Sequence, residues 1–311
     1  MSTQLINAIQ VHEYGDANQL KLEQIQRPVP GEGEVLVRVH AAGVNPVDWK
    51  IRSGWAKSFF TATFPYVPGA DLAGIVEAVG PGVTSFQPGQ AVFGRSSQGS
   101  YTEYALAPAN ALALKPESLS FDEAATIPIG ATTAWQGIFD HGNLQPGQRV
   151  LILGGAGGVG LFAIQFARWK GAQVITTTST GNVEYVRSLG AETVIDYTRT
   201  RVEDVVHDVD LVFDTVGGQA LETVWPTLKR GGTLVTVAGQ PDQAKADELG
   251  IRTARFSASV SSELLSTFAR LIDEGQVKVT IEKVFPLNEA NKAHELSQSG
   301  HGRGRIVLHI A

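Results

Sequence analysis

The chain has 311 residues, 43% hydrophobic and 18% charged, with a formal net charge of −6. Its length allows a sizeable core and about two domains, and its lack of cysteine excludes disulfides, thiolate catalysis and cysteine-ligated zinc. No lysine- or arginine-rich run appears and no apolar stretch reaches the ~20 residues of a membrane helix, so we expect neither a nucleic-acid partner nor a membrane span.

The first ~120 residues read mainly as strands and turns. Alternating segments at 8–11, 20–25 and 35–39 predict strands, and proline–glycine punctuation between them predicts tight turns. One short helix is expected at 47–52. This part of the chain therefore predicts a compact, irregular β-domain.

The pattern changes near residue 121, where 121–126 and 131–139 predict helices. Strands are then expected at 150–153, 173–177, 193–195, 211–213, 233–237 and 251–257, alternating with helices at 160–170, 182–189 and 220–228. Such alternation predicts a parallel sheet with helices on both faces. The tail predicts helices at 261–274 and 287–297 and strands at 277–284 and 305–310.

A glycine-rich loop links the first of these strands to the following helix. Gly155, Gly157 and Gly160 satisfy G-x-G-x-x-G, which supplies a tight turn, close approach to a pyrophosphate and close helix–strand packing. The helix that follows offers its N–H groups and positive dipole end to phosphates. We therefore predict a dinucleotide site whose loop residues are Gly155, Ala156, Gly157, Gly158, Val159 and Gly160. The alternative is a glycine-rich turn that only packs a helix on a sheet.

The end of the second strand bears on cofactor choice. NAD enzymes usually place a carboxylate there for the ribose 2′-hydroxyl, but residues 176–182 read TTTSTGN. The hydroxyls, Thr178 and Ser179 among them, favour NADPH. The alternative is that the threonines only fill a strand; whether Arg187 or Arg199 adds charge stays open.

Several further segments follow in order over nearly the whole chain. They read GVNPVDWK at 43–50, VPGADLAG at 67–74, GSYTEY at 99–104, GATTAW at 130–135, DTVGG at 214–218 and GRGR at 302–305. Together they resemble the zinc-independent medium-chain dehydrogenases/reductases, especially the quinone oxidoreductase and alkenal/enone reductase branch. The resemblance implies an α/β protein with a GroES-like β-domain (1–125), a Rossmann NADP-binding domain with a doubly wound parallel sheet (126–260), and a C-terminal return to the first domain (261–311). It also implies an active site in the cleft between the domains and a homodimer formed through the Rossmann edge.

The resemblance suggests further site residues. Lys50 would stand near the nicotinamide ribose and the substrate carbonyl, and Asn45 near the nicotinamide. The remaining cofactor contacts expected from the resemblance or from the strand ends are Thr132, Tyr197, Val216, Gly239 and Arg303. The competing roles are a solvated surface lysine, a turn residue before Pro46, helix capping by Thr132, and a solvated or interface Arg303. For Asp48 the alternatives are to orient Lys50, to cap a helix turn or to lie as a polar residue on the surface, and the last two are favoured.

No metal is expected. Zinc members of the superfamily place a cysteine and a Gly-His-Glu where this chain has NPVD (45–48) and GAD (69–71). Asp48 and Asp71 alone make a poor zinc set. His294 and His301 are predicted to be solvated or capping residues. Trp55, Phe59, Phe60 and Tyr66 are candidates to line an apolar substrate pocket.

These observations favour an NADPH-dependent, zinc-independent oxidoreductase. It would transfer hydride to a quinone or to the C=C bond of an α,β-unsaturated carbonyl, with proton delivery by Lys50 or water. The alternatives are a non-catalytic NADPH-binding redox sensor and an enoyl-thioester reductase, which would want a basic patch for coenzyme A. The first residues show no signal peptide, so we expect a cytoplasmic protein.

Overall fold

The computed structural model describes residues 4–58, 60–300 and 302–311. The chain forms two compact units. Unit 1 comprises Met1–Ile129, Val260–Gly275 and Val279–Ala311, and unit 2 comprises Gly130–Ser259 and Gln276–Lys278. The first boundary thus lies four residues beyond the expected 125/126, and a three-residue piece of the tail belongs to unit 2, which the sequence does not indicate.

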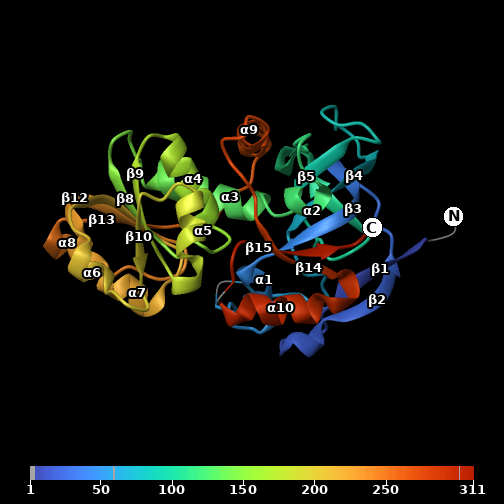
Figure 1. The fold of residues 1–311 in the computed structure, drawn as a ribbon. Coiled ribbons are helices and arrows are strands. Elements are labelled where there is room, and N and C mark those ends of the chain that lie inside the picture. The colour runs from blue at the N-terminus through green and yellow to red at the C-terminus, as the bar shows by residue number, and fades with distance from the viewer. Residues whose placement is uncertain (1–3, 59, 301) are drawn as a thin grey trace. The chain divides into compact units, whose positions relative to one another are not determined.

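Unit 1 is built on β-structure (Figure 1). Strands β1 (Leu5–Gln10) and β2 (Lys21–Gln26) pair antiparallel. A larger sheet has the order β14-β15-β3-β4-β5-β7, and β6 also pairs with β3. Its strands are β3 (Glu34–Val44), β4 (Asp71–Val79), β5 (Ala91–Arg95), β6 (Tyr104–Pro108), β7 (Leu112–Leu114), β14 (Ile281–Pro286) and β15 (Arg305–His309). The C-terminal strand β15 pairs with β3, so the tail completes the unit that the N-terminal part begins.

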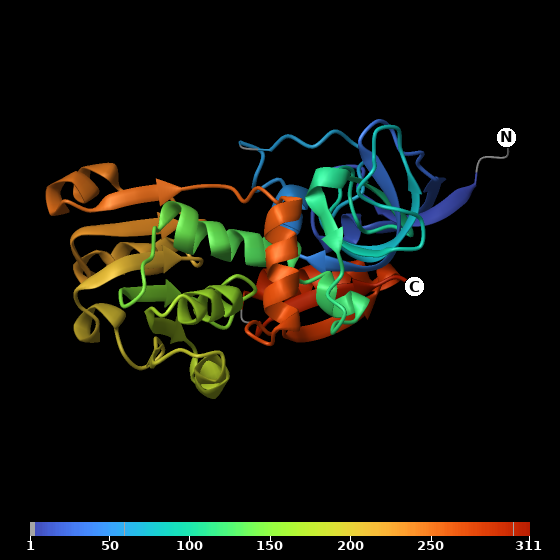
Figure 2. The ribbon, with the colours of Figure 1, turned by 90° about the horizontal axis from the view of Figure 1, so that it is seen from above.

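The helices of unit 1 are α1 (Pro46–Arg52), α2 (Phe121–Ala124), α9 (Ser262–Asp273) and α10 (Ala290–Ser299). Helices α1 and α10 contact each other and lie on the same side of the unit (Figures 1 and 2). The expected helix at 287–297 begins instead as a 3₁₀ turn, Leu287–Glu289. The expected strand at 277–284 is wrong in its first half, because β14 begins only at Ile281.

Unit 2 is a six-stranded, all-parallel sheet in the order β10-β9-β8-β11-β12-β13. Its strands are β8 (Arg149–Leu153), β9 (Gln173–Thr178), β10 (Thr193–Asp196), β11 (Val209–Asp214), β12 (Leu228–Thr236) and β13 (Arg252–Arg255). In order of appearance this is 3-2-1-4-5-6, the doubly wound order, and the winding reverses between β8 and β11. The predicted α/β class, with a GroES-like and a Rossmann-type unit, is confirmed.

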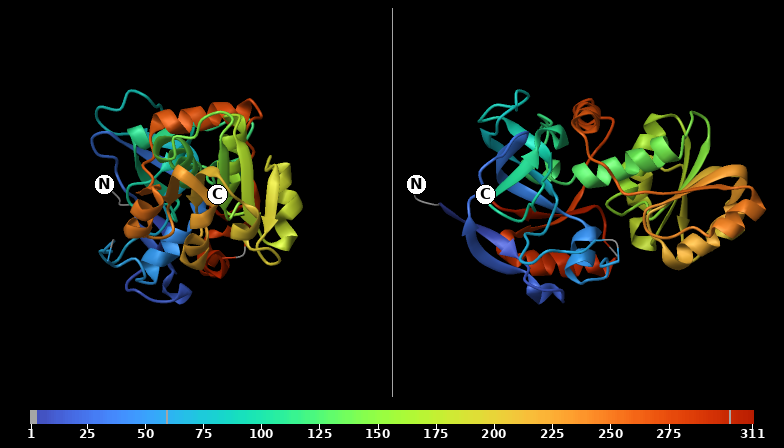
Figure 3. Two further views of the ribbon diagram at one scale, coloured as in Figure 1. Left: turned by 90° about the vertical axis from the view of Figure 1, so that its left-hand side faces the viewer. Right: turned by 180° about the vertical axis from the view of Figure 1, so that it is seen from behind.

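The helices of unit 2 cover both faces of this sheet (Figure 3). They are α3 (Pro128–Trp135, which begins in unit 1), α4 (Gly160–Trp169), α5 (Val183–Ser188), α6 (Val202–Val205), α7 (Gly218–Thr223) and α8 (Gln243–Leu249). The expected helix at 131–139 changes into a π-helical turn, Gln136–His141, and that at 220–228 ends at Thr223 before a 3₁₀ turn that contains Pro226. None of the helices in the described part of the chain has both the length and the apolar character to cross a membrane.

Candidate active site

The glycine loop of unit 2 begins where β8 ends. The Gly155 N–H donates to the Thr177 carbonyl at 3.0 Å, and the Gly154 N–H donates to the Thr177 hydroxyl at 3.1 Å. The loop then closes through a 3.0 Å bond from the Gly157 N–H to the Gly154 carbonyl. Within the described residues, no side chain caps the N-terminus of α4. The Leu161 and Phe162 N–H groups already donate to the Gly157 and Val159 carbonyls, both at 3.1 Å, so the site offers an anion the loop N–H groups just before them and the positive end of the helix dipole.

The three motif glycines differ in what surrounds them. A Cβ on Gly155 would lie 2.2 Å from the Thr176 hydroxyl, and one on Gly160 would lie 2.2 Å from the Gly154 carbonyl oxygen. A Cβ on Gly157 would meet only that carbonyl oxygen, at 3.3 Å. Gly155 and Gly160 thus allow close packing of strand, loop and helix, whereas Gly157 leaves a bare backbone surface that a pyrophosphate can approach.

The loops after β11 and β12 are tied together by one buried carboxylate. Asp214 accepts the N–H groups of Val216 and Gly217, both at 2.9 Å, and the Thr236 hydroxyl at 2.6 Å. Thr236 in turn accepts the Gly239 N–H at 3.1 Å. The predicted cofactor residues Val216 and Gly239 are therefore held by one hydrogen-bonded unit. Nothing in the sequence predicts that Thr236 links Asp214 to Gly239, because it is one threonine among several in a strand.

Val216 also lies next to the glycine loop. A Cβ on Gly154 would lie 2.8 Å from Val216 Cγ2, and the Thr215 hydroxyl donates to the Leu153 carbonyl at 2.7 Å. The carboxyl ends of β8 and β11 thus meet where the winding of the sheet reverses. Ligands bind at this place in open parallel sheets.

The hydroxyls at the end of β9 do not all face a ligand. Thr176 donates to the Ile152 carbonyl at 2.8 Å, inside the sheet, and Thr177 holds the glycine loop as described. Thr176 thus has the strand-filling role that the sequence leaves open for these threonines. Thr178, which is buried, and the half-buried Ser179 follow at the carboxyl end of the strand.

A carboxylate lies closer to this strand end than the sequence indicates. The Tyr197 N–H donates to the Thr178 carbonyl at 3.1 Å, and the Tyr197 side chain is exposed. Beside it, Asp196 Oδ2 accepts the Thr180 hydroxyl at 2.6 Å, a bond that lowers the pKa of Asp196 and keeps it ionised. Arg199 Nε lies 3.6 Å from the same oxygen and offsets part of its charge.

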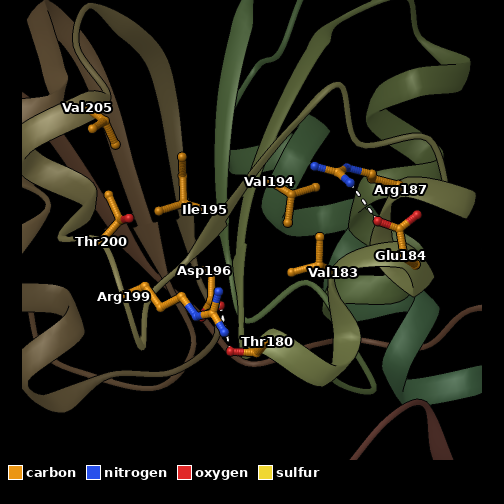
Figure 4. Close-up of a pocket in the computed structure, with 10 residues that line it drawn as sticks. All are labelled: Thr180, Val183, Glu184, Arg187, Val194, Ile195, Asp196, Arg199, Thr200 and Val205. Carbon is orange, nitrogen blue, oxygen red and sulfur yellow. Dashed lines mark hydrogen bonds and ion pairs between the residues drawn. The ribbon is translucent and has the colours of Figure 1, made fainter.

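Asp196 and Arg199 line an open pocket of about 500 Å³ along the free edge of β10 (Figure 4). On its other side, Arg187 Nη1 pairs with Glu184 Oε1 at 2.6 Å. Both arginines considered as partners for a 2′-phosphate are therefore already paired with carboxylates, Arg199 at the longer distance. The remaining lining residues are Thr180, Val183, Val194, Ile195, Thr200 and Val205.

Thr132 lies in α3, fully buried, and its hydroxyl has no hydrogen-bond partner among the described residues. A buried hydroxyl without a hydrogen-bond partner is uncommon, and a bound ligand could supply the missing partner. With the open face at Gly157 and the uncapped helix α4, this observation fits a bound dinucleotide. The residues that would hold it are those of the glycine loop, the ends of β9 and β11, and Thr132.

Lys50 belongs to α1 in unit 1. Its ammonium lies 4.9 Å from the Trp55 ring centroid and 5.7 Å from that of Trp49, and the side chain is half-buried. No carboxylate in the described part of the chain forms an ion pair with it. Burial lowers the pKa of Lys50 from its usual range, which makes the ammonium a better acid near neutral pH.

Asn45 and Asp48 take part in a buried polar cluster at the start of α1. Asp48 Oδ2 accepts the Asn45 N–H at 2.8 Å and the Tyr101 hydroxyl at 3.0 Å. Asn45 Nδ2 donates to Asp71 Oδ2 at 3.0 Å, and Asn45 Oδ1 accepts from Arg305 Nη2 at 2.8 Å. Asp48 therefore caps the helix, as expected, but is buried rather than solvated, and both polar atoms of the Asn45 amide are already occupied.

His294 corrects another expectation. Instead of being solvated, it is fully buried in α10, and its Nε2 lies 3.2 Å from the Tyr101 hydroxyl oxygen. Burial, with the charge of Arg52, lowers the pKa of His294 to about 3, so the imidazole is neutral. Tyr101 and Arg305 appear in the sequence only within family-like segments, and nothing there signals that they meet α1.

The other candidates lie as follows. Trp55 and Phe60 are exposed, Tyr66 is half-buried, and Arg303 is exposed. Phe59 and His301 lie outside the described residues. A search of the residues that the structure describes finds no group of three or more histidine, aspartate or glutamate side chains placed to hold a metal.

Comparison with known proteins finds two family profiles. Residues 31–117 match the alcohol dehydrogenase GroES-like domain, and residues 189–308 match a profile described as zinc-binding dehydrogenase. The chain is 34% identical to 2-methylene-furan-3-one reductase of Solanum lycopersicum over 96% of this chain and 77% of the relative. It is 36% identical to quinone oxidoreductase of Mus musculus over 98% of both chains.

The solved structures agree with the sequence matches. A mycobacterial protein complexed with NADPH superposes with a TM-score of 0.87 at 30% identity, covering 97% of this chain and 99% of that one. Coverage of this extent includes both units.

Proposed function

We infer the activity of this chain from its family: it belongs to the medium-chain dehydrogenases/reductases, and its relatives make it an NAD(P)H-dependent oxidoreductase acting on a small molecule. Within that family we propose an NADPH-dependent, zinc-independent reductase of quinones or of the C=C bond of α,β-unsaturated carbonyls. The observation that carries the substrate class is the Lys50 ammonium, half-buried and without a carboxylate partner among the described residues.

Bound NADPH supplies the hydride that such a reduction needs. The protein's own part is electrostatic. Hydride addition to a conjugated double bond moves negative charge onto the substrate's carbonyl oxygen, and the Lys50 ammonium is proposed to stabilise that charge and to donate the proton. The glycine loop and the start of α4 would hold the pyrophosphate, and the Asp214–Thr236 pair fixes the backbone at Val216 and Gly239, which would border the cofactor.

Two observations bear on NADPH rather than NADH. Residues 176–182 hold no carboxylate, and Thr178, Ser179 and Tyr197 gather at the end of β9, which supports NADPH. Asp196 stands nearby and opposes a second negative charge, although Arg199 offsets part of this. We propose NADPH on balance. The cytoplasmic location expected from the sequence likewise stays a prediction.

The test is a comparison of Lys50→Met with the wild-type protein. Loss of NADPH absorbance is followed with a quinone, a cyclic enone, a 2-alkenal and a saturated aldehyde, and each assay is repeated with NADH. We expect the enones to be reduced preferentially with NADPH. Turnover in the variant should fall by roughly 10²-fold, the usual contribution of general acid catalysis.

Lys57→Met is the matched control, because Lys57 lies in the loop after α1 and its ammonium lies 4.2 Å from the Tyr14 ring centroid. It should leave turnover unchanged. Equal enone turnover in Lys50→Met and wild type would remove Lys50 from the mechanism. Tight NADPH binding without turnover of any compound would instead favour the redox-sensor hypothesis.

A further inference from the structure

Arg305 and Asp71 form a buried ion pair beside the start of α1. Arg305 Nη2 lies 3.2 Å from Asp71 Oδ2, and the two side chains are 2% and 0% exposed. The same Nη2 donates to Asn45 Oδ1 at 2.8 Å. Arg305 begins the last strand, β15, so the pair joins the C-terminal tail to residues that lie far earlier in the chain.

Asp71 holds more than the arginine. Its Oδ2 accepts the Asn45 amide at 3.0 Å, and its Oδ1 accepts the Ile129 N–H, in the first turn of α3, at 3.1 Å. One carboxylate therefore fixes the residue that precedes α1 and the beginning of α3. Burial raises the pKa of Asp71 to about 6, against the opposing effect of Arg305, so the pair is ionic at neutral pH.

Stability alone does not account for such a pair. A buried ion pair is costly to desolvate, and well-packed apolar residues often replace one without loss of stability. Its directional bonds, in contrast, specify where their partners lie. Helix α1 has only seven residues and is too short to be stable in isolation, so its placement depends on contacts such as these.

We propose that Arg305 and Asp71 are positioning residues for the reduction. They fix Asn45 at the start of α1 and thereby keep Lys50, four residues after the helix begins, where its ammonium can act on the substrate. This inference rests on the proposed function of Lys50. It also gives Asn45 a role. Because its side-chain amide binds both members of the ion pair, Asn45 connects the pair to the start of the helix.

The experiment compares Arg305→Met with Arg305→Lys, which keeps the charge and one donor nitrogen. Hydrogen exchange of the peptide that covers α1 is measured by mass spectrometry, together with kcat and KM for enone and NADPH. We expect faster exchange across α1 in Arg305→Met and a kcat lower by roughly tenfold or more, as misplacement of a catalytic group produces. The KM for NADPH should stay unchanged, and Arg305→Lys should restore part of both effects.

Arg27→Met is the matched control. It removes another ion pair of unit 1, Arg27–Glu77 at 2.8 Å, which does not touch α1, and should leave α1 exchange and kcat at wild-type values. If Arg305→Met fails to fold, Arg305→Lys and Asp71→Asn are compared with the wild type in the same way.

The proposal would be overturned if Arg305→Met lowers Tm but leaves kcat and the hydrogen exchange of α1 at wild-type values. The pair would then stabilise the fold without positioning the helix. Failure of the proposed function would look different. A wild-type protein that reduces none of the test compounds would reject that function, while the exchange rate of α1 would still decide whether the pair positions the helix.

Discussion

Asp48 is a carboxyl group in surroundings that disfavour its charge. It is 5% exposed, and burial together with the nearby charge of Asp71 raises its pKa to about 7, although the Asn45 N–H and the Tyr101 hydroxyl favour the ionised form. His294, on the other side of Tyr101, has its pKa lowered to about 3. These two groups shift in opposite directions, so their contributions to the pH dependence of stability partly cancel.

The substitution Asp48→Asn removes the contribution of Asp48 to this pH dependence and leaves that of His294. Between its ordinary pKa of about 3.9 and its folded value of about 7, Asp48 binds more protons in the folded than in the unfolded protein, so its contribution to stability falls as pH rises. The variant has no carboxyl group at this position and so does not lose this stability as pH rises. Its free energy of unfolding, measured in urea, should therefore gain on the wild type from about pH 4 to about pH 7 and run parallel above that. A variant that instead loses stability relative to the wild type as pH rises from about 4 to about 7 would contradict the raised pKa.

Glycines of the same motif should respond differently to the same change. Gly160→Ala forces a Cβ to within 2.2 Å of the Gly154 carbonyl oxygen, so strand and helix must separate. We expect it to lower the free energy of unfolding by about 1–3 kcal/mol, as overpacking does. Gly157→Ala places its Cβ on the open side of the loop, so stability should change little while the Kd for NADPH rises about tenfold, or ~1.4 kcal/mol.

Urea unfolding and fluorescence titration with NADPH measure the two quantities. Arg168→Ala, at the far end of α4, serves as the control for both. The assignment of the cofactor to this loop would be wrong if the two glycine variants lose similar stability and Gly157→Ala binds NADPH as tightly as the wild type.

Local patterns in the sequence were enough to predict many of the elements. The strand, glycine loop and helix at 150–170 follow from a buried apolar run and three spaced glycines, and α1 follows from the segment after Pro46. The helix predicted at 220–228 ends at Thr223, because Pro226 cannot continue an α-helix. These errors are local and small.

Contacts between distant segments were not predictable. His294 lies in a helix with many polar residues, and only the 193-residue return to Tyr101 shows why it is buried. The Arg305–Asp71 pair spans 234 residues, and neither residue signals the other. Similarly, Asp196 is the last residue of β10, a strand that the sequence identifies, but its bond to Thr180 depends on how β9 and β10 align. Such pairings arise from topology and register, which a single sequence does not specify.

The sheet of unit 2 has two free edges, β10 and β13. A free edge presents unpaired N–H and C=O groups, which proteins usually cover or pair. The family resemblance favours pairing between copies along this sheet. We expect sedimentation equilibrium at micromolar concentration to give about twice the 33.1 kDa of one chain. A single-chain mass across that range would contradict the dimer.

The half-buried Lys50 and the absence of cysteine have a joint consequence for the lifetime of the protein. Quinones and enones are electrophiles that alkylate thiolates, and this chain offers them none. Amines react more slowly, but a lowered pKa leaves more of the Lys50 amine unprotonated and nucleophilic. The group proposed to assist turnover is therefore itself a nucleophile that the proposed substrates can alkylate, and we expect slow self-inactivation to leave an adduct on Lys50.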